Sequence, residues 1–259
     1  MAYRERDELR YEKRGHTALI TLNRPGQMNA LNHALREAIN DAVADGEADD
    51  NILSFIVTGE GGRAFCAGAD LKEMTKRDSA GEVGRAQLDS LVATCGKPVI
   101  AAIDGFCLAG GLELALRCDI RIATEQSTFG LPEPRRSLLA GYGLHNLSRI
   151  IPLGEALHIQ LTGSPITSQR AYEIGLIQRR VKDRDALMKE ATAMADEIAL
   201  CAPLAVKAIK TIVKTGRNLP VEYSEKLAVP IGKAINATED RLEGPKAFAE
   251  KRKPKWKMR

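Results

Sequence analysis

The feature that most narrows the choice of fold is an alternation of short apolar runs with helical periodicity across the first two-thirds of the chain. The apolar runs occupy residues 17–23, 52–58, 99–103 and 120–123. Residues 32–44 carry apolar side chains at helical spacing, and Asn32 precedes them as a predicted N-cap. Because the run at 99–103 is uninterrupted, we expect a strand buried on both faces. The pattern predicts α/β layering.

Beyond residue 162 the pattern changes to one helix after another, with few strand signals. The predicted helices cover residues 186–200, 204–215, 222–237 and 241–251. Pro203, Gly216 and Pro220 separate them. We therefore expect two parts, a core formed by residues 1–195 and a helical C-terminal subdomain formed by residues 196–259.

The composition is that of an ordinary globular protein, with 44% hydrophobic and 28% charged residues in 259. No run approaches the roughly 18 consecutive apolar residues of a membrane span, so no membrane association is expected. The first eight residues mix both charge signs and lack the apolar stretch of a signal peptide. A cytoplasmic location is the expectation.

Cysteine and histidine do not occur at metal-binding spacings. The five cysteines are odd in number and form no Cys-x-x-Cys pair, which argues against both a disulfide framework and a zinc site. We expect them to be small buried apolar residues. The four histidines are scattered. No metal site is predicted.

The net charge of +4 is concentrated at the C-terminal end. Residues 246–259 hold seven basic residues against one acid, whereas the rest of the chain is slightly acidic. This distribution argues against a nucleic-acid-binding surface over the whole protein. A local anion site and a solvated tail both remain open.

Two glycine-containing segments, 65–71 and 105–111, each lead from a predicted strand into a helix. Each would present unpaired backbone N–H groups at a helix N-terminus, where negative charge is stabilised. Two such groups facing one point would form an oxyanion hole. Alternatively, the glycines only permit tight turns. The chain contains no P-loop, dinucleotide fingerprint or Gly-x-Ser-x-Gly elbow, which disfavours nucleotide-driven chemistry and nucleophilic hydrolysis.

Two carboxylates, Glu113 and Glu133, stand in unusual surroundings. Glu113 lies in an apolar helix directly after Gly110 and Gly111, and Glu133 lies between two prolines. Since proline disfavours the helical conformation in the preceding residue, we expect Glu133 to be extended. Glu113 could instead be a helix-surface carboxylate and Glu133 part of a surface loop. Together they suggest a two-carboxylate active site.

These segments, in this order, resemble the successive signatures of the enoyl-CoA hydratase/isomerase (crotonase) family. The resemblance extends over nearly the whole chain. The matching residues lie at 22–25, 29–31, 65–71, 105–119, 129–133, 161–163, 171, 175–177, 243–244, 247–248 and 250–252.

The resemblance implies a crotonase-like ββα spiral core with a helical C-terminal trimerisation subdomain. It implies an acyl-CoA thioester substrate, with coenzyme A part of the substrate and no separate cofactor. It also implies a homotrimer, or a hexamer built as a dimer of trimers. A reversible hydration of a 2-enoyl thioester is the expected reaction, because many relatives with other reactions lack one or both glutamates.

The resemblance also implies roles for individual residues. The backbone N–H groups of Ala69 and Gly110 would form the oxyanion hole. Glu113 would activate water and Glu133 would protonate the α-carbon. The residues expected to contact the substrate or its coenzyme A are Arg24, Ala67, Ala69, Asp70, Leu71, Lys72, Gly110, Tyr142, Phe248 and Lys251.

The segment 136–145 departs from the family pattern, since Ser137, Ala140 and Leu144 replace an expected glycine, proline and glycine. Tyr142 or Leu139 is therefore expected to set the chain length or to favour a polar or cyclic acyl group. The polar stretch 74–85 is expected to form a mobile pocket wall.

The sequence leaves three alternative functions open. A carnitinyl-CoA or cyclic enoyl-CoA hydratase would use the same glutamates. A Δ3,Δ2-enoyl-CoA isomerase would move a double bond without consuming water. A non-enzymatic protein would bind RNA or assemble through its basic C-terminal tail.

Overall fold

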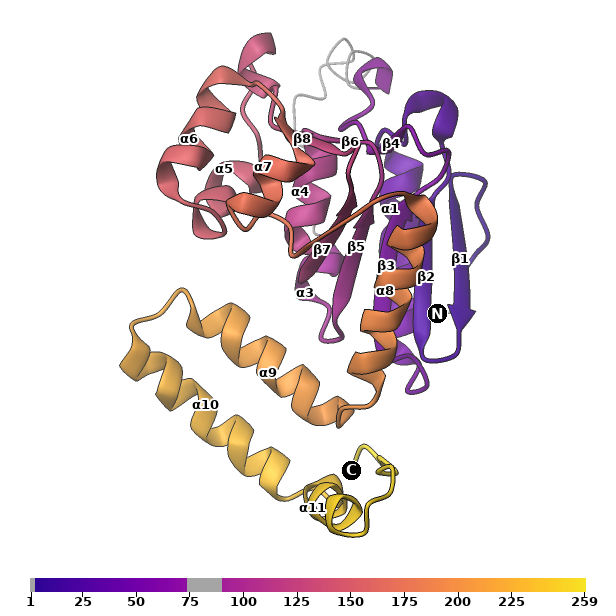
Figure 1. The fold of residues 1–259 in the computed structure, drawn as a ribbon, viewed down its shortest axis with the longest axis vertical. Coiled ribbons are helices and arrows are strands. Elements are labelled where there is room, and N and C mark those ends of the chain that lie inside the picture. The colour runs from indigo at the N-terminus through magenta and orange to yellow at the C-terminus, as the bar shows by residue number, and fades with distance from the viewer. Residues whose placement is uncertain (1–2, 74–89) are drawn as a thin grey trace.

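The computed structural model describes residues 3–73 and 90–259, and it contains two β-sheets (Figure 1). The larger sheet has the strand order β1-β2-β3-β5-β7-β10. In this sheet β1 and β2 are antiparallel, and the other pairs of neighbouring strands are parallel. Its strands are β1 (Leu9–Arg14), β2 (Thr17–Leu22), β3 (Ser54–Gly59), β5 (Val99–Ile103), β7 (Ile120–Thr124) and β10 (Arg179–Val181).

The smaller sheet has the order β4-β6-β8-β9. Its strands are β4 (Ala64–Cys66), β6 (Phe106–Leu108), β8 (Thr128–Gly130) and β9 (Ile166–Thr167). Each of β4, β6 and β8 follows directly on a strand of the larger sheet, so the chain makes three similar turns between the two sheets. This repeated crossing brings the chain segments that follow β4, β6 and β8 to one edge of the smaller sheet.

Two helices cover opposite faces of the larger sheet. Helix α1 (His33–Ala48) packs on one face, and its N-cap Asn32 accepts a hydrogen bond from the Leu35 amide at 2.9 Å. Helix α8 (Arg184–Ala199) crosses the other face (Figure 1), where Leu187, Ala191 and Ala195 are fully buried. Burial on both faces explains the uninterrupted apolar run of β5.

The other helices of the described core are short. They are η1 (Pro25–Gln27), α3 (Leu91–Thr94), α4 (Gly110–Arg117), η2 (Glu133–Arg136), α5 (Tyr142–Asn146), η3 (Leu147–Arg149), α6 (Leu153–Thr162) and α7 (Ser168–Glu173). None of the helices in the described residues is long and apolar enough to cross a membrane.

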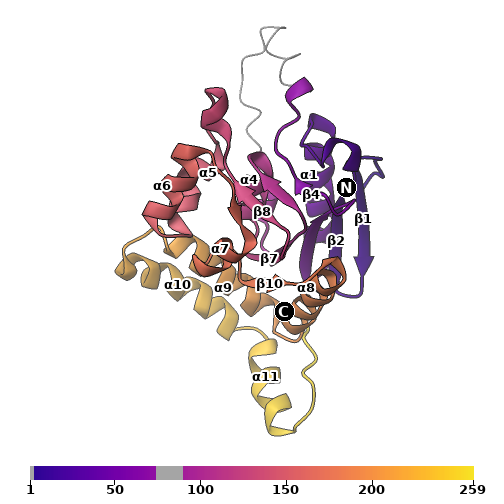
Figure 2. The same ribbon diagram turned by 45° about the horizontal axis from the view of Figure 1, so that its top comes forward.

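The last three helices extend away from the sheets in both views (Figures 1 and 2). They are α9 (Pro203–Gly216), α10 (Val221–Asn236) and α11 (Asp240–Ala249). Lys210 and Lys214 of α9 bind the two carboxylate oxygens of Asp119, at 2.6 and 2.9 Å, and so join this part to the larger sheet. Several apolar side chains here are exposed, among them Val221 at 73% and Phe248 at 88%.

The basic C-terminal segment folds back on α11. The Arg252 guanidinium binds both oxygens of Glu243, at 2.6 and 2.9 Å. Trp256 Nε1 donates to the carbonyl of Leu200 at 3.1 Å, and the carbonyl of Arg259 accepts from the Glu239 amide at 2.6 Å. We refer to residues 252–259, held in this way, as the C-terminal clasp. These contacts contradict a purely solvated tail.

The longer predicted elements are confirmed, and the shorter ones show corrections. Strand β5 has the predicted bounds, and the four predicted C-terminal helices are present within two residues at each end. Glu133, however, is not extended but begins the 3₁₀ helix η2, because Pro134 is tolerated in a first helical turn, where its missing N–H is not needed. The pocket wall expected at 74–85 lies outside the described residues.

The cysteines behave as expected with one exception. Cys66, Cys95, Cys107 and Cys118 are buried, and burial raises the pKa of the Cys66 thiol to about 12. Cys201 is exposed, because it lies in the turn between α8 and α9.

Candidate active site

The segment after β4 presents an unused backbone amide at Ala69. The Leu31 amide donates to the Gly68 carbonyl at 2.7 Å, and the Asp70 amide donates to the Leu31 carbonyl at 3.1 Å. The bridge between Leu31 and Ala69 therefore uses the Gly68 carbonyl and the Asp70 amide, which flank Ala69, and not the Ala69 amide itself. Among residues 3–73 and 90–259, the Ala69 N–H has no acceptor. Gly68 permits the bend, with φ at +113°.

The segment after β6 presents a second unused amide, at Gly110. Ala109 has φ +50° and ψ −127°, and its amide donates to the Gly130 carbonyl at 2.9 Å. A non-glycine residue in so rare a conformation costs about 1–3 kcal/mol, and such residues cluster at functional sites. Gly110 is the first residue of α4, so its N–H has no acceptor within the helix.

The two amides lie close together. A Cβ placed on Gly110 would be 3.6 Å from the Ala69 nitrogen, and one placed on Gly68 would be 3.5 Å from the Gly110 nitrogen. Gly111 is required for this approach, because a Cβ there would lie 2.1 Å from the Cys66 carbonyl oxygen. The structure therefore brings together the two predicted oxyanion donors at the N-terminus of α4.

Glu113 lies in the first turn of α4, the helix that begins at Gly110. The Gly143 amide donates to its Oε1 at 2.8 Å, and a Cβ on Gly141 would lie 3.4 Å from the same oxygen. The amide donor and the N-terminus of α4 both place partial positive charge beside this carboxylate.

Glu133 is held in a different environment. Its Oε2 atom is buried and has no hydrogen-bond partner among the described residues. Burial raises the pKa of the Glu133 carboxyl, and the negative charge of Glu113 raises it further, against the opposing effects of its own backbone N–H and of Arg136. The proton is therefore retained on Glu133 over a wider pH range than on an ordinary glutamate.

The residues around Ala69 include five of the other predicted substrate contacts, which differ in how they are held. Arg24 and Asp70 form an ion pair at 2.9 Å, with side chains only 14% and 15% exposed. Although burial opposes it, the hydrogen bond from Arg24 holds the pKa of the Asp70 carboxyl below its usual value. Leu71 and Lys72 follow as exposed residues. Ala67, by contrast, uses its amide internally, on the Met28 carbonyl.

The two side chains noted in segment 136–145 differ in exposure. Leu139 is 67% exposed, whereas Tyr142 is partly buried and packs against the core. The Arg117 guanidinium lies over the Tyr142 ring, 4.1 Å from its centroid. Arg117 was not predicted to belong to the site, although a second charged residue in a mainly apolar helix was the signal available for it.

Phe248 and Lys251 are not brought to this site within one chain. Helix α11 lies at the end of the molecule away from α4 and the smaller sheet in both views (Figures 1 and 2). Phe248 projects from α11, and Lys251 follows it. A contribution from these two residues would have to come from another copy of the chain.

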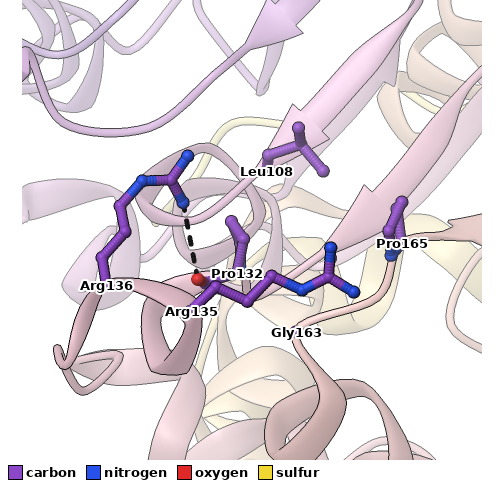
Figure 3. Close-up of a pocket in the computed structure, with 7 residues that line it drawn as sticks. Leu108, Pro132, Arg135, Arg136, Gly163 and Pro165 are labelled. Carbon is purple, nitrogen blue, oxygen red and sulfur yellow. Dashed lines mark hydrogen bonds between the residues drawn. The ribbon is translucent and has the colours of Figure 1, made fainter.

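A cleft of about 280 Å³ lies beside η2 (Figure 3). The residues that line it are Leu108, Gly130, Pro132, Arg135, Arg136, Gly163 and Pro165. Arg135 donates to the Thr162 carbonyl and to Ser164, and Arg136 donates to the Pro132 carbonyl at 3.5 Å. The cleft contains no carboxylate, so it does not offer the acid–base pair that Glu113 and Glu133 provide.

In the described part of the chain, no group of three or more potential metal ligands is close enough to hold an ion.

The matches to known proteins cover nearly the full length of the chain. Residues 12–259 match the family described as enoyl-CoA hydratase/isomerase. The chain is 39% identical over 256 residues to the enoyl-CoA hydratase EchA19 of Mycobacterium tuberculosis, with 96% of each chain covered. It is 36% identical over 250 residues to the (E)-benzylidenesuccinyl-CoA hydratase of Thauera aromatica, with 95% of this chain and 97% of that one covered.

Among solved structures, the chain resembles the enoyl-CoA hydratase EchA1 of Mycobacterium marinum. The TM-score is 0.91 at 36% identity, and the alignment covers 98% of this chain and 100% of the other. The α/β fold with two sheets and C-terminal helices is thus the fold of that enzyme.

Proposed function

The chain belongs to the enoyl-CoA hydratase/isomerase family, and we propose that it adds water reversibly, with syn geometry, to a 2-enoyl-CoA thioester to give a 3-hydroxyacyl-CoA. The observation that carries the proposal is the pairing of two unused amides with two carboxylates in unlike surroundings. The first pair can stabilise an enolate, and the second can move the two protons that hydration requires.

The thioester carbonyl oxygen accepts hydrogen bonds from the amides of Ala69 and Gly110. Attack on the β-carbon transfers negative charge to this oxygen, and the two fixed donors stabilise that charge without rearranging. The loss of one donor of this type costs about 2.7–4 kcal/mol of transition-state stabilisation.

The two glutamates divide the proton transfers. Glu113, as the charged base, accepts a proton from water, and the resulting hydroxide oxygen forms the bond to the β-carbon. Glu133, as the acid, gives its proton to the α-carbon, where the enolate electron pair forms the new C–H bond. Proton exchange with solvent water then returns Glu113 to the charged form and Glu133 to the neutral form.

The coenzyme A portion lies, in this proposal, along the surface formed by Arg24, Asp70, Leu71 and Lys72. Phe248 and Lys251 are supplied to this surface by a neighbouring copy in a homotrimer, or in a hexamer of two trimers. The exposed apolar side chains of α9 to α11 support such an assembly, since a second copy would cover them.

The test is conversion of a 2-enoyl-CoA panel that includes short, long, branched, cyclic and carnitinyl acyl groups. We expect loss of the conjugated enoyl thioester absorbance and formation of 3-hydroxyacyl-CoA, identified by mass spectrometry with ¹⁸O-labelled water. Movement of a double bond without incorporation of labelled oxygen would replace hydration with isomerisation. Absence of turnover across the whole panel would refute the proposal.

A further inference from the structure

Arg117 is buried at the end of α4, only 8% exposed, and forms no ion pair among residues 3–73 and 90–259. Its Nη1 donates to the backbone carbonyl of Glu113 at 3.0 Å, one turn earlier in the same helix. A guanidinium has five N–H donors, and this bond uses one of them. Because a buried charge without a partner is costly, a contact of another kind must account for the position of this side chain.

That contact is with the face of the Tyr142 ring. Arg117 Cζ lies 4.1 Å from the ring centroid, which is a cation–π contact. Tyr142 is the first residue of α5 and packs against the core. The Asn146 side chain donates to the Tyr142 carbonyl at 2.9 Å and so holds the backbone of the same residue. Arg117 thus joins α4 to the start of α5.

The residue after Tyr142 contacts the proposed base. The Gly143 amide donates to Glu113 Oε1 at 2.8 Å. Little space surrounds Gly143, since a Cβ there would lie 2.9 Å from Leu131 Cδ1 and 3.5 Å from Glu113 Cγ. One planar peptide bond joins Tyr142 to Gly143, so a displacement of Tyr142 also moves this amide. The distance between the Gly143 nitrogen and Glu113 Oε1 therefore depends on the position of Tyr142.

The chain that precedes Tyr142 offers few other anchors. Residues 134–139 are all exposed. Gly141 has no side chain to hold the start of α5, and Ala140 is buried but contributes only a methyl group. Within residues 134–142, Tyr142 alone combines a large side chain with packing against the core. Its contact with Arg117 therefore acts at the main side-chain anchor of this segment.

A nearby arginine that serves structure alone is held differently. Arg121, only 5% exposed, donates to three backbone carbonyls, those of Leu176, Ala115 and Cys118. None of these bonds reaches the candidate site. Arg117 instead connects the helix that carries Glu113 with the segment that supplies the hydrogen-bond donor to Glu113.

We propose that Arg117 is a positioning residue for hydration, because its contact with Tyr142 holds the Gly143 amide against the Glu113 carboxylate. This hydrogen bond fixes Oε1 of Glu113. Among the described residues Oε2 accepts no hydrogen bond, so it is the oxygen available to accept a proton from water. Arg117 itself takes no part in the proton transfers. The inference rests on the proposed role of Glu113 as the base.

Hydrogen exchange of the Gly143 amide, followed by mass spectrometry on the substrate-free protein, tests the contact without turnover. Arg117→Met removes the cation and Tyr142→Leu removes the ring. Each should increase the exchange rate of this amide by about 2- to 30-fold, since exchange requires the hydrogen bond to open. An unchanged rate in either variant would overturn the inference.

Two further variants make this result specific. Arg117→Lys keeps the charge but not the planar group, and it should give a smaller increase than Arg117→Met. Arg149→Met is the matched control, because Arg149 lies in the neighbouring η3 and donates to Asn218 rather than to the site. It should leave the exchange of the Gly143 amide unchanged, and an increase equal to that of Arg117→Met would overturn the inference.

Steady-state hydration then shows whether the contact acts through Glu113. Arg117→Met should lower kcat by about 10- to 100-fold, because a misplaced base loses rate steeply, while the affinity for a saturated acyl-CoA should stay the same. In a Glu113→Gln background no base remains to be positioned, so Arg117→Met should cause no further loss. An equal further loss in that background would overturn the inference.

The two measurements separate this inference from the proposed function. Normal kcat in Arg117→Met, in a protein that hydrates enoyl thioesters, would refute the positioning role and leave hydration standing. Faster exchange of the Gly143 amide in Arg117→Met and Tyr142→Leu, in a protein whose parent form hydrates no thioester of the panel, would refute hydration and leave the contact through Tyr142 standing.

Discussion

The start of α4 and the turn η2 each present one glutamate, but they treat it in opposite ways. Glu113 sits in a regular helix and receives a hydrogen bond from the Gly143 amide. Glu133 sits between two prolines, and one of its oxygens is enclosed without a partner. The environment, rather than the residue type, therefore suits one carboxylate to act as a base and the other to act as an acid.

Glutamine at either position removes one of the two proton-transfer groups. Glu113→Gln and Glu133→Gln should each lower kcat by about 100- to 10,000-fold, because each glutamine keeps the shape but cannot exchange a proton. Stopped assays with the preferred thioester would measure the loss. Affinity for a saturated acyl-CoA should change little in both variants, and near-normal turnover by either one would remove that glutamate from the mechanism.

The amide pair offers the next largest effect. Ala69→Pro removes one of the two oxyanion donors and should lower kcat by about 100- to 1,000-fold. Ala69→Gly is the matched control, since it keeps the N–H and should lose far less. If a folded Ala69→Pro protein retained full activity, the Ala69 amide would not contact the thioester.

The thermal stability of the Glu133→Gln variant tests the raised pKa of Glu133 without any substrate. Because the pKa of Glu133 is raised in the folded state, its neutral form contributes stability that is complete below the ordinary glutamate pKa and is lost as pH rises through the raised value. Glutamine cannot ionise, so the variant should unfold at a higher temperature than the parent near neutral pH. Melting curves at fixed protein concentration should converge in acid, and a parent protein that is more stable at neutral pH would contradict the raised pKa.

Arg136 should have a smaller effect, through its influence on the pKa of Glu133. Catalysis in the hydration direction needs protonated Glu133, so kcat should fall as pH rises through its raised pKa. Arg136 lowers that pKa, and Arg136→Gln should therefore move the alkaline limb of the kcat profile to higher pH. Arg135→Gln is the control, and a shift of equal size in both variants would assign the effect to overall charge.

The sequence predicted what depends on local chemistry. Residues 99–103 are apolar throughout and form β5 with the predicted bounds, and Asn32 caps α1 through its own side chain. Strands β4, β6 and β8 were not recognised, because three residues are too few to show a period and pairing between distant segments holds them. The helical turn at Glu133 was also missed. The residue before a proline prefers an extended conformation, but in the folded chain Glu133 begins η2.

In the candidate site, too, the sequence indicated individual residues but not the contacts that depend on the fold. The glycine segments and both glutamates were noticeable in the sequence, but the closeness of the two amides depends on the Leu31–Ala69 bridge and on the conformation of Ala109. The contact between Arg117 and the Tyr142 ring could not be predicted from the sequence, because it joins α4 to α5 only in the folded chain. For Phe248 and Lys251 even the fold of one chain is insufficient, so their roles remain predictions.

The C-terminal clasp has a practical consequence for anyone handling the protein. The backbone oxygen of Arg259 accepts a hydrogen bond from the Glu239 amide, and the Arg259 side chain binds the carboxylate of the same residue. An affinity tag fused after Arg259 would therefore extend a folded element, and the added residues would compete for the contacts that hold α11.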